Sequence, residues 1–400
     1  MSEEIPIVED SPNRLFIPAM VVATAAVSVS TGILTLFVVD VASTFHVPVG
    51  VASQLSTVNH AGVLVFGLLM SVLVVRFRHK SLMLAGVLVT IIAAIGNFYT
   101  PDLSIMQIFF VMEGIGTAIV GIMSSTLIGD LLLPKNRASA VSYVFATGWI
   151  MALISIPWSG FIANVAGWRF VFILQMLPLS LAGLILAFFA VPSESRITTV
   201  RVKKVSPIES FRQILTDKSA MACLASGVLS ISGPGMAIFG VALYRQRFSM
   251  PLDFTVALSL AIVALHVVGN LVAGRLTNKF GAKPVAVTCK LLAGVSTITF
   301  FLMPNLLGAL VFNFLQVWFA SLVSPAYTCL ALSQVPKSRG SMMSLFTTTR
   351  SLASTIATAV GGALLVLTFG FYGAVGLALG GMSLAAAIIL FLFAKDPTRS

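Results

Sequence analysis

Twelve long apolar segments, separated by short polar turns, constrain the fold of this chain more than any other feature of its sequence. Each segment is about as long as the roughly 20 residues that a helix needs to cross a bilayer, or longer. Membrane-spanning β-strands need only about 10 residues. The sequence therefore predicts an all-α integral membrane protein with twelve transmembrane helices, at roughly 15–39, 51–75, 81–99, 104–133, 138–163, 169–191, 220–243, 253–275, 283–303, 305–332, 341–366 and 371–394.

The composition agrees with this class and argues against others. Hydrophobic residues make up 58% of the chain and charged residues 9%, whereas soluble domains carry about 25% charged residues. The net charge of +11 is spread over short turns rather than one face or arm, so no nucleic-acid partner is expected. The first fourteen residues lack the basic region of a cleaved signal peptide, so we expect the first apolar segment to be retained as a helix.

No pattern of enzyme chemistry occurs in the sequence. Cys223, Cys289 and Cys329 lie inside apolar segments without CxxC or Cys/His spacing, which disfavours a disulfide framework, a metal site and a bound cofactor. The HExxH and P-loop patterns are missing, and the loops are too short for a catalytic or signalling domain. An enzyme, an ATP-driven pump and a scaffold are therefore disfavoured.

Lysine and arginine predict the orientation of the chain, because they concentrate in cytoplasmic loops. Of the 24, Arg169, Arg245 and Arg247 fall on one side, and Lys290 and Arg350 lie within apolar segments. The other 19 (24 − 3 − 2) fall on the side that holds both termini. We therefore expect a multi-pass protein of the cell membrane with both termini in the cytoplasm.

A polar linker at 192–219 divides the chain into two halves. Its six basic residues either lie along anionic lipid headgroups or belong to a solvated tether. The predicted organisation is a cytoplasmic tail, a six-helix bundle, the linker, a second six-helix bundle and a second tail, at 1–14, 15–191, 192–219, 220–394 and 395–400.

The two halves repeat one another with an offset of 203 residues (274 − 71). The matched pairs are Gly235 with Gly32, Gln316 with Glu113, Leu276 with Leu73, Phe280 with Phe77, and Lys283 with Lys80. Two similar halves that start on the same side are related by an axis along the membrane normal. We therefore expect two pseudo-symmetric six-helix bundles that bind a small molecule between them and expose it to each side in turn.

This arrangement resembles the major facilitator superfamily over residues 15–394. The family's basic turn after the second helix of each half is present in the second half as Gly274, Leu276, Asn278, Lys279, Phe280, Gly281 and Lys283. The first half keeps Ser71, Leu73, Arg76 and Lys80, with Val75 in place of the acidic residue and Arg78 in place of the glycine. The resemblance implies a conformational role for these turns; the alternative is that they only anchor the topology.

Two glycines of the turn in the second half have roles that follow from their lack of a side chain. Gly281 is expected to supply backbone freedom where the chain reverses. Gly274 is expected to let a neighbouring helix approach closely.

Two further motifs resemble drug–proton antiporters and sugar-efflux relatives within that family. In the fourth helix Phe110 replaces an arginine, Glu113 stands for a glutamine, and Gly114 is kept. In the fifth helix the matching residues are Ile156, Pro157, Ser159 and Gly160. The resemblance implies a monomer in the lipid bilayer that exports a small organic molecule in exchange for protons. Uptake or facilitated passage of an organic anion or metabolite is the alternative, and Arg350 motivates it.

Ionisable residues within the membrane are costly and are therefore candidates for function. Glu113 is predicted to bind the transported proton, or else to be hydrogen-bonded to a neighbouring helix. Arg350 is predicted to pair with Glu113, to hold an anionic substrate, or to reach the cytoplasmic surface. Lys290 is expected at the periphery, with its amine extended to the surface. Asp40, at the outer end of the first helix, is expected to be solvated rather than to guard the mouth of a cavity.

Several uncharged polar residues complete the candidate site. His60, beside Asn59, and His266 are either packing residues or proton relays. Gln316, Asn313, Trp149, Tyr244 and Tyr327 are candidates for contacts with the substrate. Gly233, Pro234 and Gly235 are expected to break the seventh helix near its middle, as a gate or as an ordinary kink, and Pro157 is a second candidate kink.

Overall fold

The computed structural model describes residues 14–131, 134–192, 207–335 and 339–395. Most of both predicted tails and the linker residues 193–206 lie outside this part. The first half contains α1 (Phe16–Thr44), α2 (Val49–Ala52), α3 (Gln54–Arg76), α4 (His79–Tyr99), α5 (Leu103–Leu131), α6 (Pro134–Ala166), the π-helical η1 (Phe172–Met176) and α7 (Leu177–Ala190).

A short helix, α8, and nine further elements follow. They are α8 (Pro207–Thr216), α9 (Lys218–Val228), α10 (Ser232–Gly235), the π-helical η2 (Met236–Gly240), α11 (Val241–Arg247), α12 (Leu252–Phe280), α13 (Ala282–Leu302), α14 (Leu306–Gln334), α15 (Arg339–Leu367) and α16 (Tyr372–Phe393). Within the described residues, eleven helical segments are long and apolar enough to cross a membrane. The predicted fifth span corresponds to α6, whose apolar part, Ile150–Ala166, is shorter. The all-helical membrane fold is therefore confirmed.

The duplication is visible in the backbone as well as in the sequence. The helices α4 and α13 begin at residues 79 and 282 and end at 99 and 302, so both bounds differ by 203 (282 − 79 and 302 − 99). Residues with positive φ follow the same offset: His46 matches Ser249, and Gly167 matches Gly370. Because left-handed backbone is unusual for histidine and serine, these matches reflect a shared local geometry.

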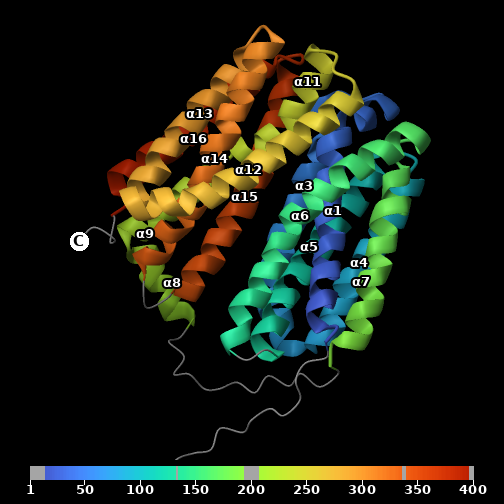
Figure 1. Ribbon diagram of the computed structural model, residues 1–400, viewed down its shortest axis with the longest axis vertical. Coiled ribbons are helices and arrows are strands. Elements are labelled where there is room, and N and C mark those ends of the chain that lie inside the picture. Colours follow the sequence, from blue (N-terminus) through green and yellow to red (C-terminus); the bar gives the residue numbers. More distant parts are fainter. Residues whose placement is uncertain (1–13, 132–133, 193–206, 336–338, 396–400) are drawn as a thin grey trace, which may run out of the picture.

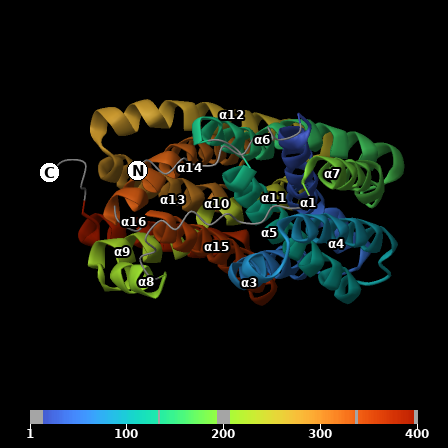
Figure 2. The same ribbon diagram turned by 90° about the horizontal axis from the view of Figure 1, so that it is seen from below.

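The helices form two groups that lie side by side (Figure 1). Helices α1 to α7 form the right-hand group and α9 to α16 the left-hand one, and α8 lies at the bottom of the view. We call the end with α8 the linker end and the opposite end the far end. The two groups touch along two main seams, α6 against α12 and α2–α3 against α15, which lie on opposite edges when the molecule is seen from below (Figure 2). Helix α1 also contacts α11 and η2.

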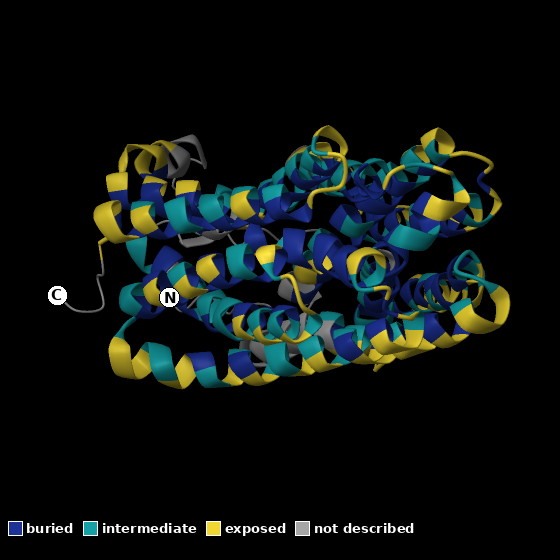
Figure 3. Cartoon of the chain, turned by 90° about the horizontal axis from the view of Figure 1, so that it is seen from above, coloured by how far each residue is buried: buried dark blue, intermediate teal, exposed yellow. Residues whose placement is uncertain are grey.

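Apolar packing joins the halves at the far end only, among the described residues. One buried cluster contains residues of both halves, among them Phe37, Phe172, Phe239 and Phe300. Two other clusters each belong to a single half, one around Phe16 and one around Phe346. Exposed residues follow the outward faces of the helices (Figure 3), where large apolar side chains such as Leu271 and Phe189 face the position of lipid. The halves are therefore packed together at the far end and separate toward the linker end.

The basic turn of the second half needs its glycine, as expected. Gly281 joins α12 to α13 with a φ of 92°, a conformation that costs other residues free energy. In the first half the matching residue, Arg78, has an extended backbone with a φ of −65°, so no glycine is required there. The expectation for Gly274 is wrong: among the described residues, a Cβ at this position would meet nothing within 4 Å, so no described helix packs closely against it.

The basic side chains of both turns rest on aromatic rings or are exposed. Lys80 lies 5.1 Å from the ring centre of Phe188, and Lys279 lies 5.2 Å from that of Phe280. Lys283 lies 5.7 Å from the ring centre of Phe391. Arg76 and Asn278 are exposed.

Candidate functional site

The far end is closed by polar contacts between the halves. Asp40, at the end of α1, forms a two-point ion pair with Arg245 of α11, in which Arg245 Nη2 lies 2.9 Å from Asp40 Oδ1. Asn164 of α6 donates to Asp253 at the start of α12. The expectation that Asp40 is merely solvated is therefore wrong, because the packing of α11 against α1 brings a guanidinium to it.

A second seam at the far end depends on two glycines. A Cβ at Gly50 of α2 would lie 2.4 Å from the carbonyl oxygen of Gly362 in α15, so the two backbones touch. One turn further along, Thr57 Oγ1 donates to Thr358 Oγ1 at 2.8 Å. Close approach of small residues is a usual device of helix packing in membranes, and here it joins the two halves.

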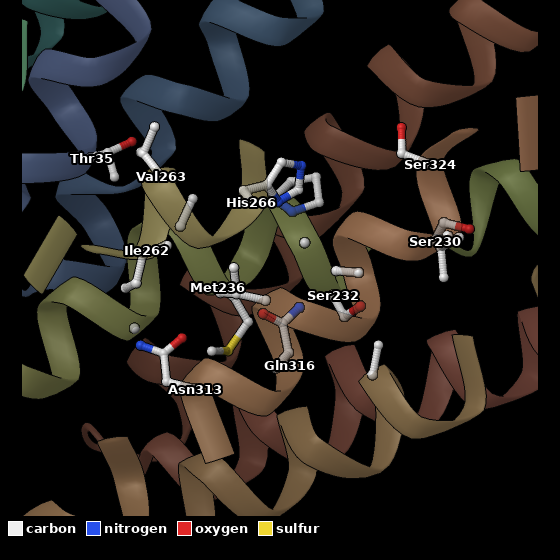
Figure 4. Close-up of a pocket in the computed structure, with 18 of the residues that line it drawn as sticks. Thr35, Ser230, Ser232, Met236, Ile262, Val263, His266, Asn313, Gln316 and Ser324 are labelled. Atoms are coloured by element: carbon white, nitrogen blue, oxygen red, sulfur yellow. The ribbon is translucent and has the colours of Figure 1, made fainter. Parts of the chain in front are cut away.

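Below this closure lies a cavity of about 510 Å³. It is lined almost entirely by the second half, from α9, α10, η2, α11, α12, α13, α14, α15 and α16, with Thr35 of α1 and Ile156 of α6 as the first half's contribution. In Figure 4 the side chains of Asn313 and Gln316 of α14 and of Ser232 of α10 gather around one space, with Ile262 and Met236 among its apolar neighbours. The cavity is therefore asymmetric between the two halves.

The predicted break of the seventh helix forms one wall of this cavity. Helical structure is interrupted at 229–231, just before α10, and η2 follows directly. Gly233 and Pro234 line the cavity, while a Cβ at Gly235 would meet Leu379 of α16 at 2.3 Å. The interruption therefore lies before Gly233, Pro234 and Gly235, which are themselves helical, and not at these residues as predicted. Pro157, by contrast, lies inside α6 without interrupting it.

Lys290 is in the cavity, and the expectation that it extends to the surface is wrong. Only 4% of the residue is exposed. Its Nζ donates to Ser226 Oγ and Ser230 Oγ, at 2.8 Å in each case, and lies 3.9 Å from the centre of the Tyr327 ring. The reason is that α13 packs against both α14 and α16, so this face of the helix points into the bundle rather than toward lipid.

Arg350 also lines the cavity, from α15. It is exposed to the space around it, and no carboxylate pairs with it among the described residues. The predicted pair with Glu113 is therefore not formed. No aspartate or glutamate appears among the described residues that line the cavity, which leaves Lys290 and Arg350 as its charged side chains, beside His266.

Amide and phenol groups complete the lining. Asn313 donates to the Tyr244 hydroxyl at 3.1 Å, and both residues are buried. Gln316 is 2% exposed, and its Nε2 has no hydrogen-bond acceptor among the described residues. Tyr327, which packs under Lys290, donates to the carbonyl of Cys223. Four of the predicted contacts, Asn313, Gln316, Tyr244 and Tyr327, thus lie in one place; the side chain of Trp149 lies outside the described part.

The other candidates lie in the first half, outside the cavity lining. Glu113 is 1% exposed and accepts a hydrogen bond from Asn97 Nδ2 at 2.6 Å, which joins α5 to α4. Asn59 donates to the Phe110 carbonyl at 3.1 Å, and the Nδ1 of His60 lies 2.8 Å from the Ser56 carbonyl within its own helix. These residues connect neighbouring helices or turns of one bundle.

Lys290, Ser226 and Ser230 are the site residues that the sequence did not indicate. The two serines stand four residues apart, as residues on one helix face do; Ser226 lies in the last turn of α9 and Ser230 within the helix break. Such a pair beside a break in an apolar segment was the available signal. Nothing in the sequence showed that Lys290 faces them.

The fold and the cavity can be compared with known proteins. A family model for the Major Facilitator Superfamily matches residues 20–269 and 258–400. The chain belongs to the major facilitator superfamily. An uncharacterised MFS-type transporter of Bacillus subtilis (strain 168), YfhI, is 22% identical over 141 residues, which are 35% of this chain and 34% of YfhI. The match therefore spans about a third of that relative.

Solved structures share the fold of this major facilitator over nearly its whole length. A D-xylose–proton symporter superposes with a TM-score of 0.76 at 16% identity, covering 96% of this chain and 98% of the other. The nucleoside transporter NupG gives a TM-score of 0.76 at 13% identity, covering 96% and 100%. The inward-open xylose transporter XylE from E. coli gives 0.70 at 15% identity, covering 95% and 96%. The chain is a membrane transporter and not an enzyme. Because the sequence identities are low, these structures do not indicate its substrate, which has to be inferred from the cavity of this chain.

Proposed function

We propose that this major facilitator moves a small organic anion across the membrane by alternating access. One observation carries the proposal: the cavity presents Lys290 and Arg350 and, among its described lining, no carboxylate. Two cationic groups without a protein counter-ion are costly in a membrane, and a bound anion would offset that cost. The apolar walls favour an organic anion over a small inorganic one.

The proposed orientation places both termini in the cytoplasm, with the halves at 15–191 and 220–394. The far end then faces outward, where Asp40–Arg245 and the Gly50–Gly362 contact close it. The likeness to an inward-open transporter supports this orientation. Each chain contains a complete cavity, so we expect it to work as a monomer in the bilayer.

The second candidate is proton-coupled efflux of an uncharged or cationic compound, as in drug–proton antiporters. Pro157 within α6 and the largely apolar cavity walls favour it. Against it stands the position of Glu113, the predicted proton carrier, which lies between α4 and α5 and outside the cavity lining.

A matched pair of probes separates the two candidates. Benzenesulfonate and benzenesulfonamide have similar shapes, but only the first is an anion at neutral pH. We expect benzenesulfonate to raise the melting temperature of the purified protein and benzenesulfonamide to have no effect. A ligand at 100 times its dissociation constant adds about 2.7 kcal/mol. The Arg350→Gln variant should lose this stabilisation.

Flux into proteoliposomes then tests transport. We expect uptake of labelled benzenesulfonate that the Arg350→Gln variant abolishes. Stabilisation and flux with D-xylose, a nucleoside or benzenesulfonamide, but not with the sulfonate, would contradict the proposed anion specificity.

A further inference from the structure

Lys290 differs from Arg350 in a way that bears on what drives transport. A guanidinium stays protonated in proteins, whereas a lysine amine can release its proton when buried. We propose that Lys290 is the proton-binding group of the cavity: its amine takes up a proton when an organic anion enters and releases it when the anion leaves. This assignment rests on the proposed anion transport and names the residue that couples it to protons.

The contacts of Lys290 suit both protonation states. Its Nζ makes two hydrogen bonds, to Ser226 Oγ and Ser230 Oγ. Ser230 Oγ uses its own hydrogen to donate to the Ser226 carbonyl at 2.5 Å, so its lone pairs accept from the lysine. A neutral amine has two N–H groups and an ammonium three. Protonation therefore adds a donor and a charge without breaking either bond.

Among the described residues, the groups beside Lys290 and around its cavity include no carboxylate. Tyr327 of α14 contacts the amine and Cys223 of α9 lies near it; Ser232 of α10, His266 of α12, Arg350 of α15 and Ser383 of α16 line the same cavity. Between residues 217 and 395 the sequence contains two acidic residues, Asp217 and Asp253. Asp217 caps the N-terminus of α9, and Asp253 accepts from Asn164 at the far end. The described residues thus supply no carboxylate as counter-ion for an ammonium at Lys290, and a substrate anion would supply one.

The charges of the empty and loaded cavities are equal under this assignment. With Lys290 neutral, the empty cavity carries the single positive charge of Arg350. With Lys290 protonated and a monoanion bound, two positive charges and one negative charge leave the same net charge (+2 − 1 = +1). Over a complete cycle no net charge would then cross the membrane, because each anion would cross together with one proton.

Titration calorimetry on the detergent-purified protein tests this assignment. Benzenesulfonate is the probe, because its sulfonate stays ionised and brings no proton of its own. Measured in buffers with different ionisation enthalpies at several pH values around neutrality, the binding heat gives the number of protons taken up. We expect wild-type protein to take up to about one proton per bound anion.

Two variants fix Lys290 in one charge state. Lys290→Arg stays protonated, so we expect it to bind the probe without proton uptake. Lys290→Met stays neutral, and we expect it to bind at least about tenfold more weakly and also without proton uptake. Lys218→Met removes the same side chain from an exposed position at the start of α9, and proton uptake should persist in it.

The outcomes separate this assignment from the function on which it rests. Failure of the wild-type protein to bind the sulfonate contradicts anion transport itself. Binding without proton uptake in wild type, or with undiminished uptake in either Lys290 variant, overturns the role of Lys290 alone. Loss of uptake in His266→Gln with retention in Lys290→Arg would assign the proton to His266 and would equally overturn the proposal.

Discussion

Breaking the ion pair between Asp40 and Arg245 should open the far end of the protein. The two side chains are 27% and 14% exposed, respectively, which places the pair between two limits. An exposed pair contributes about 0–1 kcal/mol, whereas removing one partner of a fully buried pair costs about 3–5 kcal/mol. We therefore expect Arg245→Gln to destabilise the closed far end by about 2 kcal/mol. Because about 1.4 kcal/mol is a factor of ten, the ratio of open to closed molecules should rise about 30-fold.

Distance measurements by electron paramagnetic resonance can follow this change. Val165 and Leu307 lie near the far end, one in each half, and are 72% and 74% exposed. Spin labels at Val165→Cys and Leu307→Cys, with the three native cysteines replaced by serine, would report the separation of the halves. If about 1% of wild-type molecules are open at this end, a typical size for a minor state, about a quarter should be open in Arg245→Gln.

A double-mutant cycle provides the control. Asp40→Asn alone should have a similar effect, and combining it with Arg245→Gln should add little, because both changes remove one interaction. Exchanging the two residues, Asp40→Arg with Arg245→Asp, should restore the short distance. An unchanged distance distribution in all single variants would refute the reasoning and leave the closure to the apolar cluster shared by the halves.

Three further predictions concern backbone contacts and the first half. Gly50→Ala places a Cβ 2.4 Å from the Gly362 carbonyl oxygen, so the label separation at the far end should increase; no increase would show that the seam can yield. Gly281→Ala should lower the free energy of unfolding by about 1 kcal/mol, because its φ of 92° strains other residues; an unchanged melting temperature would contradict this. Glu113→Gln should keep proteoliposome flux of the sulfonate within about twofold of wild type. The reason is that Glu113 bonds to Asn97 outside the cavity lining, and substitutions away from a site usually have small effects. Loss of flux in a folded Glu113→Gln protein would return this residue to the transport mechanism.

The sequence predicted the helices well because lipid imposes a simple rule on them. A helix that spans the bilayer must be apolar over its full length, so its ends show directly as polar turns. The third span was expected at 81–99, and α4 runs over His79–Tyr99. The offset of 203 residues was also readable, since both copies kept their turn positions.

The faces of the helices were not readable in the same way. Periodicity is weak when nearly every residue is apolar, so the sequence placed Lys290 at the periphery and Glu113 in the transport path without showing which way either side chain faces. The structure turns Lys290 into the cavity and Glu113 toward α4. The packing around Gly274 was not predictable either. The family motif indicates that this residue belongs to the turn, but it does not indicate how close the neighbouring helices lie.

The unequal contribution of the two halves to the cavity lining has a consequence for the path of the substrate. The first half contributes Thr35 and Ile156 to the described lining. A substrate bound by Lys290 and Arg350 would therefore remain bound to the second half throughout the cycle. The first half would then move relative to a fixed binding site and open it to water. Substitutions on α1 and α6 should accordingly alter the rate of substrate release far more than the binding affinity.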